Sequence, residues 1–289
     1  MKHYFYGLRG RLLLPVLFAV IPAFALNFYT VANERQEAAA NAERYAVNLV
    51  QLAAREQRRL VTSTKQFLLS LSKLPEVKKP TSVQACHHTL AEVHTPFSHY
   101  RLIGLALANG DVFCRSLPIS TKVNISDRGY FQRAVYTRGF GIGEYQIGRA
   151  TLKNSINFGQ AVLDASGEVR TVVFAALDLD WLSQLIATTD LPPGSSMEVI
   201  DSRGTVLARY PDPEKWVGKT VPEASLIDTI ITRRDGGTAQ VKGIDGINRL
   251  YAFAPLHDNP DDPPATSLSP WAFRPTLYSL PPTASSNAT

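Results

Sequence analysis

Cysteine is scarce in this chain of 289 residues, and Cys86 and Cys114 are the two present. An isolated pair of cysteines in an oxidising compartment favours a disulfide. The pattern places Cys86 on a helix and Cys114 on a later strand, so a bridge would join helix to sheet. We predict a Cys86–Cys114 disulfide, with two buried free thiols as the alternative.

Concentrated charge is also lacking, because the formal net charge is +5 and no basic run stands out. A nucleic-acid-binding surface needs lysine and arginine clustered on one face. No such cluster is interleaved with aromatic residues, so the sequence predicts no nucleic-acid partner.

Motifs of catalysis are absent. The sequence contains no Gly-x-Ser-x-Gly, Walker loop, His-Glu-x-x-His or Cys-x-x-Cys. The cyclase sequence Gly-Gly-Asp-Glu-Phe and a phosphoacceptor-histidine segment are missing as well. Four histidines lie close together, but His87 and His88 point to different helix faces and no carboxylate has a matching spacing. We expect no enzyme activity, no cofactor and no metal.

A long apolar run is present at residues 12–32, after the basic Lys2, Arg9 and Arg11. About 20 apolar residues are enough for a helix to cross a bilayer, and the basic flank stays in the cytoplasm. We predict a cytoplasmic N-terminus at 1–11, a transmembrane anchor at 12–32 and the bulk of the chain outside. A cleaved signal peptide ending near Ala23-Phe24-Ala25 is the alternative, and it exports the same domain.

Helical periodicity continues over residues 33–75, where apolar residues step by three and four until Pro75. At 1.5 Å per residue this helix would measure roughly 60 Å. We predict a long stalk helix that carries displacement to the bilayer, and we expect a homodimer through paired stalks.

Strand patterns follow, arranged twice as a hairpin, a loop with a short helix, and a second hairpin. The first hairpin turns at Gly110, and its counterpart turns at Gly204. We predict an α+β fold with two modules at 76–190 and 191–256, each with an antiparallel sheet.

The residues after the second module have a different composition. Residues 257–289 are rich in proline, serine, threonine and alanine, and they contain no apolar run that could span a bilayer. This composition is typical of disorder. We predict a disordered tail, and we hypothesise a truncated or frameshifted receptor that lacks its signalling half.

The segment Asn124-Ile-Ser-Asp-Arg-Gly-Tyr-Phe131 resembles the signature of double Cache (dCache) sensor domains of bacterial membrane receptors. Further marks occur in the same order along the chain. They are Gly143-Glu144, Gly148-Arg149, Phe158, Val162-Leu-Asp-Ala-Ser-Gly167, Ala176-Leu-Asp178-Leu-Asp-Trp181, Val199-Ile-Asp201-Ser-Arg-Gly204 and Trp216-Val-Gly218. The resemblance implies two PAS-like modules along one long helix and a location in the bacterial inner membrane, with the modules in the periplasm. It also implies that a small molecule binds in the membrane-distal module and signals to a histidine kinase, a diguanylate cyclase or a chemotaxis module.

The resemblance also points to ligand-binding residues. Arg128, Tyr130 and Arg149 are candidates for holding an anionic group, because guanidinium groups offer paired donors to a carboxylate. Asn157 would add a hydrogen bond, and Asp178 would meet an ammonium group. The alternatives are a surface ion pair of Asp127 with Arg128 and a helix cap at Asp178.

The expected ligand is a small carboxylate or an amino acid. The full tyrosine-arginine-tryptophan-tyrosine-aspartate pattern of the amino-acid-binding subfamily is missing, so another small metabolite stays open. The expected function is therefore ligand sensing. The rival functions are the input half of a histidine kinase or diguanylate cyclase, and a non-catalytic envelope scaffold.

Overall fold

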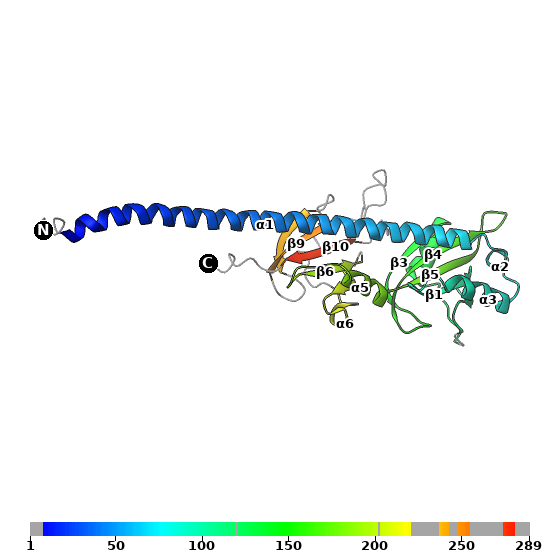
Figure 1. The fold of residues 1–289 in the computed structure, drawn as a ribbon. Helices are drawn as coiled ribbons and strands as arrows, with labels where there is room; N and C mark the ends of the chain where they lie inside the picture. Colours follow the sequence, from blue (N-terminus) through cyan, green and yellow to red (C-terminus); the bar gives the residue numbers. More distant parts are fainter. Residues whose placement is uncertain are drawn as a thin grey trace. The chain divides into compact units, whose positions relative to one another are not determined.

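The computed structural model describes residues 8–118, 121–201, 203–220, 237–242, 248–254 and 274–280 (Figure 1). The chain divides into two compact units, residues 1–45 with 283–289 and residues 46–282. Helix α1 (Leu8–Leu71) contributes to both units without a break at Asn33. The expected stalk helix is therefore part of a longer helix, and it ends at Leu71. Pro75 begins the short helix α2 (Pro75–Lys78), where its missing N–H costs no hydrogen bond.

The predicted anchor falls on α1, but many side chains of residues 8–39 lie outside the described part of the chain. The described side chains there include Phe24, Leu26, Phe28 and Tyr29, and all four are exposed. Within the described residues, no helix is long and apolar enough to cross a membrane.

The first sheet of the larger unit has the strand order β2-β1-β5-β4-β3. All its neighbouring strands are antiparallel. Its strands are β1 (Tyr100–Leu107), β2 (Val112–Arg115), β3 (Phe140–Ile147), β4 (Asn154–Leu163) and β5 (Val169–Asp178). Its helices are α3 (Val83–His94), α4 (Gly129–Thr137) and α5 (Leu179–Ala187).

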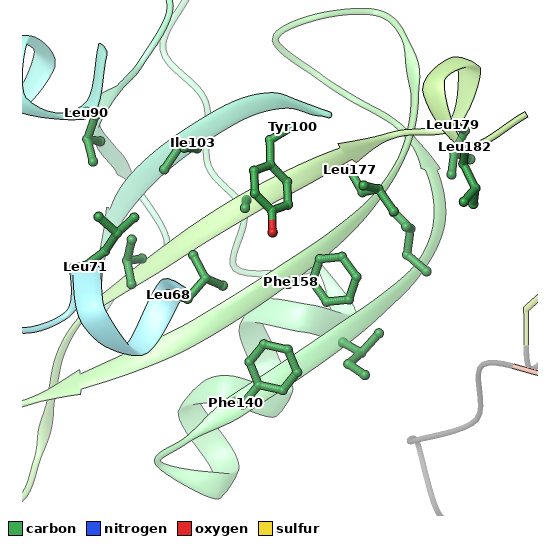
Figure 2. Close-up of a cluster of buried hydrophobic side chains, with 14 of the residues drawn as sticks. Leu68, Leu71, Leu90, Tyr100, Ile103, Phe140, Phe158, Leu177, Leu179 and Leu182 are labelled. Atoms are coloured by element: carbon green, nitrogen blue, oxygen red, sulfur yellow. The ribbon is translucent and has the colours of Figure 1, made fainter. Parts of the chain in front are cut away.

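The two faces of this sheet are covered by different helices. On one face, Leu68 and Leu71 of α1 and Leu90 of α3 pack with Ile103 and Phe158 of the sheet (Figure 2). On the other face, Tyr130, Phe131 and Ala134 of α4 pack with strand residues such as Phe174. The face under α4 is the one that contains the candidate site.

A disulfide fixes the edge of this sheet. Cys86 of α3 is bonded to Cys114 of β2, with their Cα atoms 6.0 Å apart. This confirms the predicted bridge, which joins the helix to the edge strand.

The second sheet has the strand order β7-β6-β10-β9-β8. Its strands are β6 (Ser196–Ile200), β7 (Val206–Tyr210), β8 (Gly237–Lys242), β9 (Asn248–Ala254) and β10 (Arg274–Leu280), and α6 (Pro213–Trp216) follows β7. Numbered within its own sheet, each set of strands reads 2-1-5-4-3. An α+β chain with repeated antiparallel sheets was predicted, and the topology agrees with it.

Strand β10 corrects the prediction of a disordered tail for residues 274–280. It pairs with β6 on one side and β9 on the other, so it completes the second sheet beyond the predicted boundary at residue 256. Pro275 is accommodated because the register with β6 shifts between Arg274 and Thr276, an irregularity at which no ladder N–H is required. The rest of the tail, 255–273 and 281–289, lies outside the described residues, as does the helix expected at 223–233.

Polar contacts join the two sheets through β3. The backbone N–H of Tyr145 donates to Oδ2 of Asp201, at 3.2 Å. Glu144 forms ion pairs with Arg133 of α4 and, at 3.3 Å, with Arg203 of the β6–β7 turn. Burial alone would raise the pKa of Glu144, but the hydrogen bond from Arg133 and the two positive charges hold it below its usual value. Glu144 is therefore a charged link between α4 and the second sheet.

Candidate ligand-binding site

A pocket lies on the face of the first sheet that α4 covers. Its cavity measures about 30 Å³, and the figure rises to about 450 Å³ when the open space at its mouth is counted. Strand residues alternate between the two faces of a sheet. For this reason Leu102 of β1, Ser155 and Asn157 of β4, and Phe174 and Ala176 of β5 share this face. The remaining lining residues are Val112, Arg115, Val123, Ile125, Arg128, Tyr130, Gln146, Gly148, Arg149, Ala150 and Thr151.

Glycines allow α4 to approach the sheet closely. A Cβ atom built on Gly141 would lie 2.5 Å from the carbonyl oxygen of Tyr130, and one on Gly159 would lie 3.2 Å from it. A real Cβ cannot be accommodated at the shorter of these distances, so Gly141 is required for the packing. The glycine-rich segment around β3 thus seats the helix that presents Tyr130 to the pocket.

Tyr130 is fully buried, with 1% of its surface exposed. Burial raises the pKa of Tyr130 to about 12, and interaction with the Asn157 side chain opposes this rise. At neutral pH the tyrosine is protonated, and its hydroxyl is a hydrogen-bond donor on the pocket wall.

Two polar atoms on β4 lack partners. Ser155 and Asn157 are 1% and 5% exposed. Their atoms Oγ and Oδ1 are buried, and neither has a hydrogen-bond partner among the residues that the structure describes. A buried polar group without a partner is uncommon and calls for an explanation. Because both side chains line the pocket, a polar ligand would satisfy them.

Arg149 is committed to an ion pair. Its two terminal nitrogens lie 2.7 and 2.6 Å from the two carboxylate oxygens of Asp127, and Nη1 also donates to the carbonyl of Asn124 at 2.6 Å. The hydrogen bond lowers the pKa of Asp127 and raises the pKa of Arg149. In place of the alternative Asp127–Arg128 pair, the structure has an Asp127–Arg149 pair. Arg149 lines the pocket, and Asp127 already balances its charge.

Arg128 is an arginine of the pocket whose side chain has no partner in the described part of the chain. It occupies the N-cap position of α4 without a side-chain capping bond. Its guanidinium makes no hydrogen bond or ion pair with any residue in the described part of the chain. A partly buried guanidinium in this state is suited to binding a carboxylate through paired N–H donors.

Asp178 does not line the pocket with the other four predicted residues. Its Oδ1 accepts a hydrogen bond from the N–H of Asp180 at 3.0 Å and caps α5. Its Oδ2 lies 2.6 Å from Nη2 of Arg101. The helix-cap alternative therefore describes Asp178 better than a direct ligand contact.

The structure brings together four of the five predicted residues: Arg128, Tyr130, Arg149 and Asn157. Their role in binding stays a prediction. Residues missed at the sequence level include Ser155 and Gln146. Ser155 lies two positions before Asn157, so strand alternation alone places both on one face. Gln146 carries no comparable signal.

The histidines serve separate structural roles. His87 Nδ1 contacts the carbonyl of Arg115, and His94 Nε2 lies 2.6 Å from the carbonyl of Tyr100. No group of three or more potential metal ligands occurs within the described ranges.

The fold consists of two modules, each with one five-stranded antiparallel sheet of the order 2-1-5-4-3. Residues 31–272 match the sequence profile of the Cache domain family, of the double (dCache) type. This match covers most of the chain, so the chain belongs to the double Cache family. The resemblance drawn from the motif at Asp127–Phe131 is confirmed.

A relative by sequence is sporulation kinase D of Bacillus subtilis (strain 168), which is 26% identical over 201 residues. The alignment covers 70% of this chain and 39% of the kinase. The chain thus spans about two fifths of the length of this curated relative.

Two solved structures share the fold. The extracellular domain of rpHK1S-Z16, described as a histidine kinase, has a TM-score of 0.72 at 17% identity and covers 85% of this chain and 96% of its own. The ligand-binding domain of the Pseudomonas fluorescens chemoreceptor CtaA, in complex with L-isoleucine, has a TM-score of 0.63 at 18% identity. It covers 86% of this chain and 95% of its own. At these identities the likeness concerns the fold.

Proposed function

We propose that this chain is the sensing module of a signal-transduction receptor and that it binds a small carboxylate or amino acid outside the cytoplasm. The proposal is carried by the pocket beneath α4, which combines an uncommitted Arg128 with the buried, unpartnered atoms of Ser155 and Asn157. The same fold in the CtaA domain holds L-isoleucine, which supports a small ligand.

The pocket chemistry suggests how such a ligand is held. Arg128 donates paired hydrogen bonds to the carboxylate, and the Tyr130 hydroxyl donates a further one. Ser155 and Asn157 bond the remaining polar atoms. Leu102 and Phe174 contact the apolar part. None of these groups needs to react, so the module itself has a binding role without catalysis.

A thermal-shift screen of the full chain against organic acids and amino acids tests the proposal, since a ligand that binds the folded state raises its stability. We expect hits that are lost in Arg128→Ala and weakened in Tyr130→Phe. Arg170→Ala, at an exposed arginine on β5 that does not line the pocket, is the matched control and should keep every hit. Ligand binding that survives Arg128→Ala would place the site elsewhere, and no hit in a broad library would favour the envelope scaffold.

A histidine-kinase output is favoured by the similarity to sporulation kinase D, of which the chain spans 39%. A chimera that carries this chain in place of the aligned part of that kinase tests the output directly. We expect autophosphorylation to change with a ligand found in the screen, and the change should vanish with Arg128→Ala. A chimera that is active but indifferent to ligand would contradict this assignment. A diguanylate cyclase output stays a prediction from the resemblance.

Membrane anchoring through residues 12–32 is supported by their apolar sequence and by the exposed Phe24, Leu26, Phe28 and Tyr29. A receptor in the bacterial inner membrane with a periplasmic domain follows from this placement. Alkaline phosphatase fused after the last residue of the full chain should be active, and carbonate washing should leave the chain in the membrane fraction. Release by carbonate would contradict the anchor.

A homodimer through α1 is supported by apolar side chains left exposed on it, such as Leu52 and Leu69 at 56% and 44%. Cysteine cross-linking along α1 should give dimers with a helical periodicity. Cross-linking that lacks this periodicity would contradict paired stalks.

A further inference from the structure

The charged residues that line the candidate pocket, among those that the structure describes, are Arg115, Arg128 and Arg149, and Arg149 is already paired with Asp127. No aspartate or glutamate of the described residues lines the pocket itself. An amino acid brings an ammonium group as well as a carboxylate. Without a carboxylate partner, the ammonium would lose its hydration beside like charges, which is unfavourable.

Asp178 is placed to provide that carboxylate. On β5, Phe174 and Ala176 line the pocket, and Asp178 is the next position on the same face. It also lies opposite Ser155 of β4, which lines the pocket too. Directly opposed residues of antiparallel strands point to the same face. On the pocket face of β5, Phe174 and Ala176 are therefore followed by the acidic Asp178 at the rim of the pocket.

Arg101 occupies this carboxylate. Its Nη2 lies 2.6 Å from Oδ2 of Asp178 and 3.3 Å from Oδ2 of Asp180. The other oxygen of Asp178 accepts the N–H of Asp180. Both oxygens are engaged, and 13% of the Asp178 side chain is exposed. An ammonium group that approached Asp178 would have to displace a guanidinium already in contact.

We propose that Arg101 determines the ligand class of this receptor. By occupying Oδ2 of Asp178, it keeps that oxygen from an ammonium group and makes the pocket selective for carboxylates that lack an α-ammonium group over the amino acids of the same shape. This inference rests on the proposed function, because it concerns the ligand of the same pocket. Arg101 does not line that pocket, so it acts as a positioning residue through Asp178.

The test compares acids with their α-amino counterparts by calorimetric titration of the full chain. The pairs are propionate with L-alanine, succinate with L-aspartate, and 4-methylpentanoate with L-leucine. In the best-binding pair, we expect the acid to bind about tenfold more tightly or better, which corresponds to about 1.4 kcal/mol. Arg101→Gln should narrow or reverse this ratio, because it frees Asp178 to meet the ammonium group.

Two further variants keep the result interpretable if Arg101→Gln changes the fold locally. Arg101→Gln/Asp178→Asn should lose the gained amino-acid affinity. Asp180→Asn touches the same arginine but should leave the acid preference unchanged, since Asp180 is not on the pocket row. Equal binding of acid and amino acid by the wild-type chain, or an acid preference that Arg101→Gln leaves intact, would overturn the inference while sensing stands. If neither series binds, the sensing function fails and the selectivity falls with it.

Discussion

The two sheets share one strand order but differ in the polar groups that they bury. In the first sheet, the pocket face leaves Ser155 and Asn157 with unpartnered atoms beside an uncommitted Arg128. In the second sheet, Glu198 and Arg209 face each other across β6 and β7 at 2.9 Å, and both are nearly fully buried. Within the described residues, the same topology therefore carries a pocket face with two unpartnered polar atoms in one sheet and a buried ion pair in the other.

The second sheet adds an aromatic partner to its buried charge. The Arg209 guanidinium lies over the Trp216 ring, 4.8 Å from the ring centroid, a favourable cation–π geometry. The contrast to be tested is therefore between the polar atoms of the pocket in the first sheet and the buried ion pair of the second. Four predictions probe the comparison, from the largest expected effect to the smallest.

Arg209→Ala should have the largest effect, since it removes the guanidinium that lies 2.9 Å from the carboxylate of the buried Glu198. A broken buried pair costs about 3–5 kcal/mol. Denaturant unfolding of the full chain should show this loss, and the double replacement Glu198→Leu/Arg209→Met should recover most of it. If the single variant is as stable as wild type, the second sheet does not depend on its internal charge pair.

Cys86→Ser/Cys114→Ser should destabilise the first module by about 2–4 kcal/mol, because the bridge closes a loop between residues 28 apart in sequence. Hydrogen exchange should report the loss in α3 and β2 and not in β6 and β7. Reductant should reproduce the effect on wild type and add nothing to the variant. Equal loosening of both sheets would show that the modules unfold as one.

Gly141→Ala should cost about 1–3 kcal/mol, since overpacking forces the backbone to move. The new Cβ would press on the carbonyl of Tyr130 and displace α4, so ligand affinity should fall together with stability. Gly139→Ala is the matched control, because its nearest neighbour would be 3.6 Å away. Unchanged affinity in Gly141→Ala would separate the helix position from binding.

The Asp127–Arg149 pair should contribute least to stability. Both side chains are exposed, at 59% and 42%, and a surface pair contributes roughly 0–1 kcal/mol. The lowered pKa of Asp127 means that its contribution is present above the pKa of the unfolded chain and is lost as pH falls through the folded pKa. Asp127→Asn should therefore lower stability slightly at neutral pH and not at strongly acidic pH. A large neutral-pH loss would contradict the pair's surface character.

Much of the fold follows from local pattern. Apolar periodicity predicted the long helix, and turn residues predicted the hairpins around Gly110 and Gly204. Strand β10 was missed because Pro275 within it and the proline-rich, polar sequence around it resemble a disordered segment. Pairing on both sides, through β6 and β9, outweighs that composition, and such long-range pairing is not visible in the sequence of seven residues.

The candidate site was predictable where one motif supplies it and not where partners come from distant segments. Arg128 and Tyr130 belong to one motif, and Asn157 lies on the strand beside it. The ion pair of Asp178 is formed with Arg101, which is more than 70 residues away in sequence. The local sequence around Asp178 predicts a helix cap but does not predict this ion-pair partner. The pairing of Asp127 with Arg149 rather than with its neighbour Arg128 is likewise a result of the fold.

Strand β3 contacts both the candidate pocket and the second module. Its residue Gln146 lines the pocket, while the backbone N–H of the preceding Tyr145 donates a hydrogen bond to Asp201, which follows β6. Adjacent residues of a strand move together, so a molecule that displaces Gln146 should also change the hydrogen bond between Tyr145 and Asp201. The chemical shift of the Tyr145 amide, measured by nuclear magnetic resonance, should therefore change when a molecule enters the pocket, even without a large rearrangement.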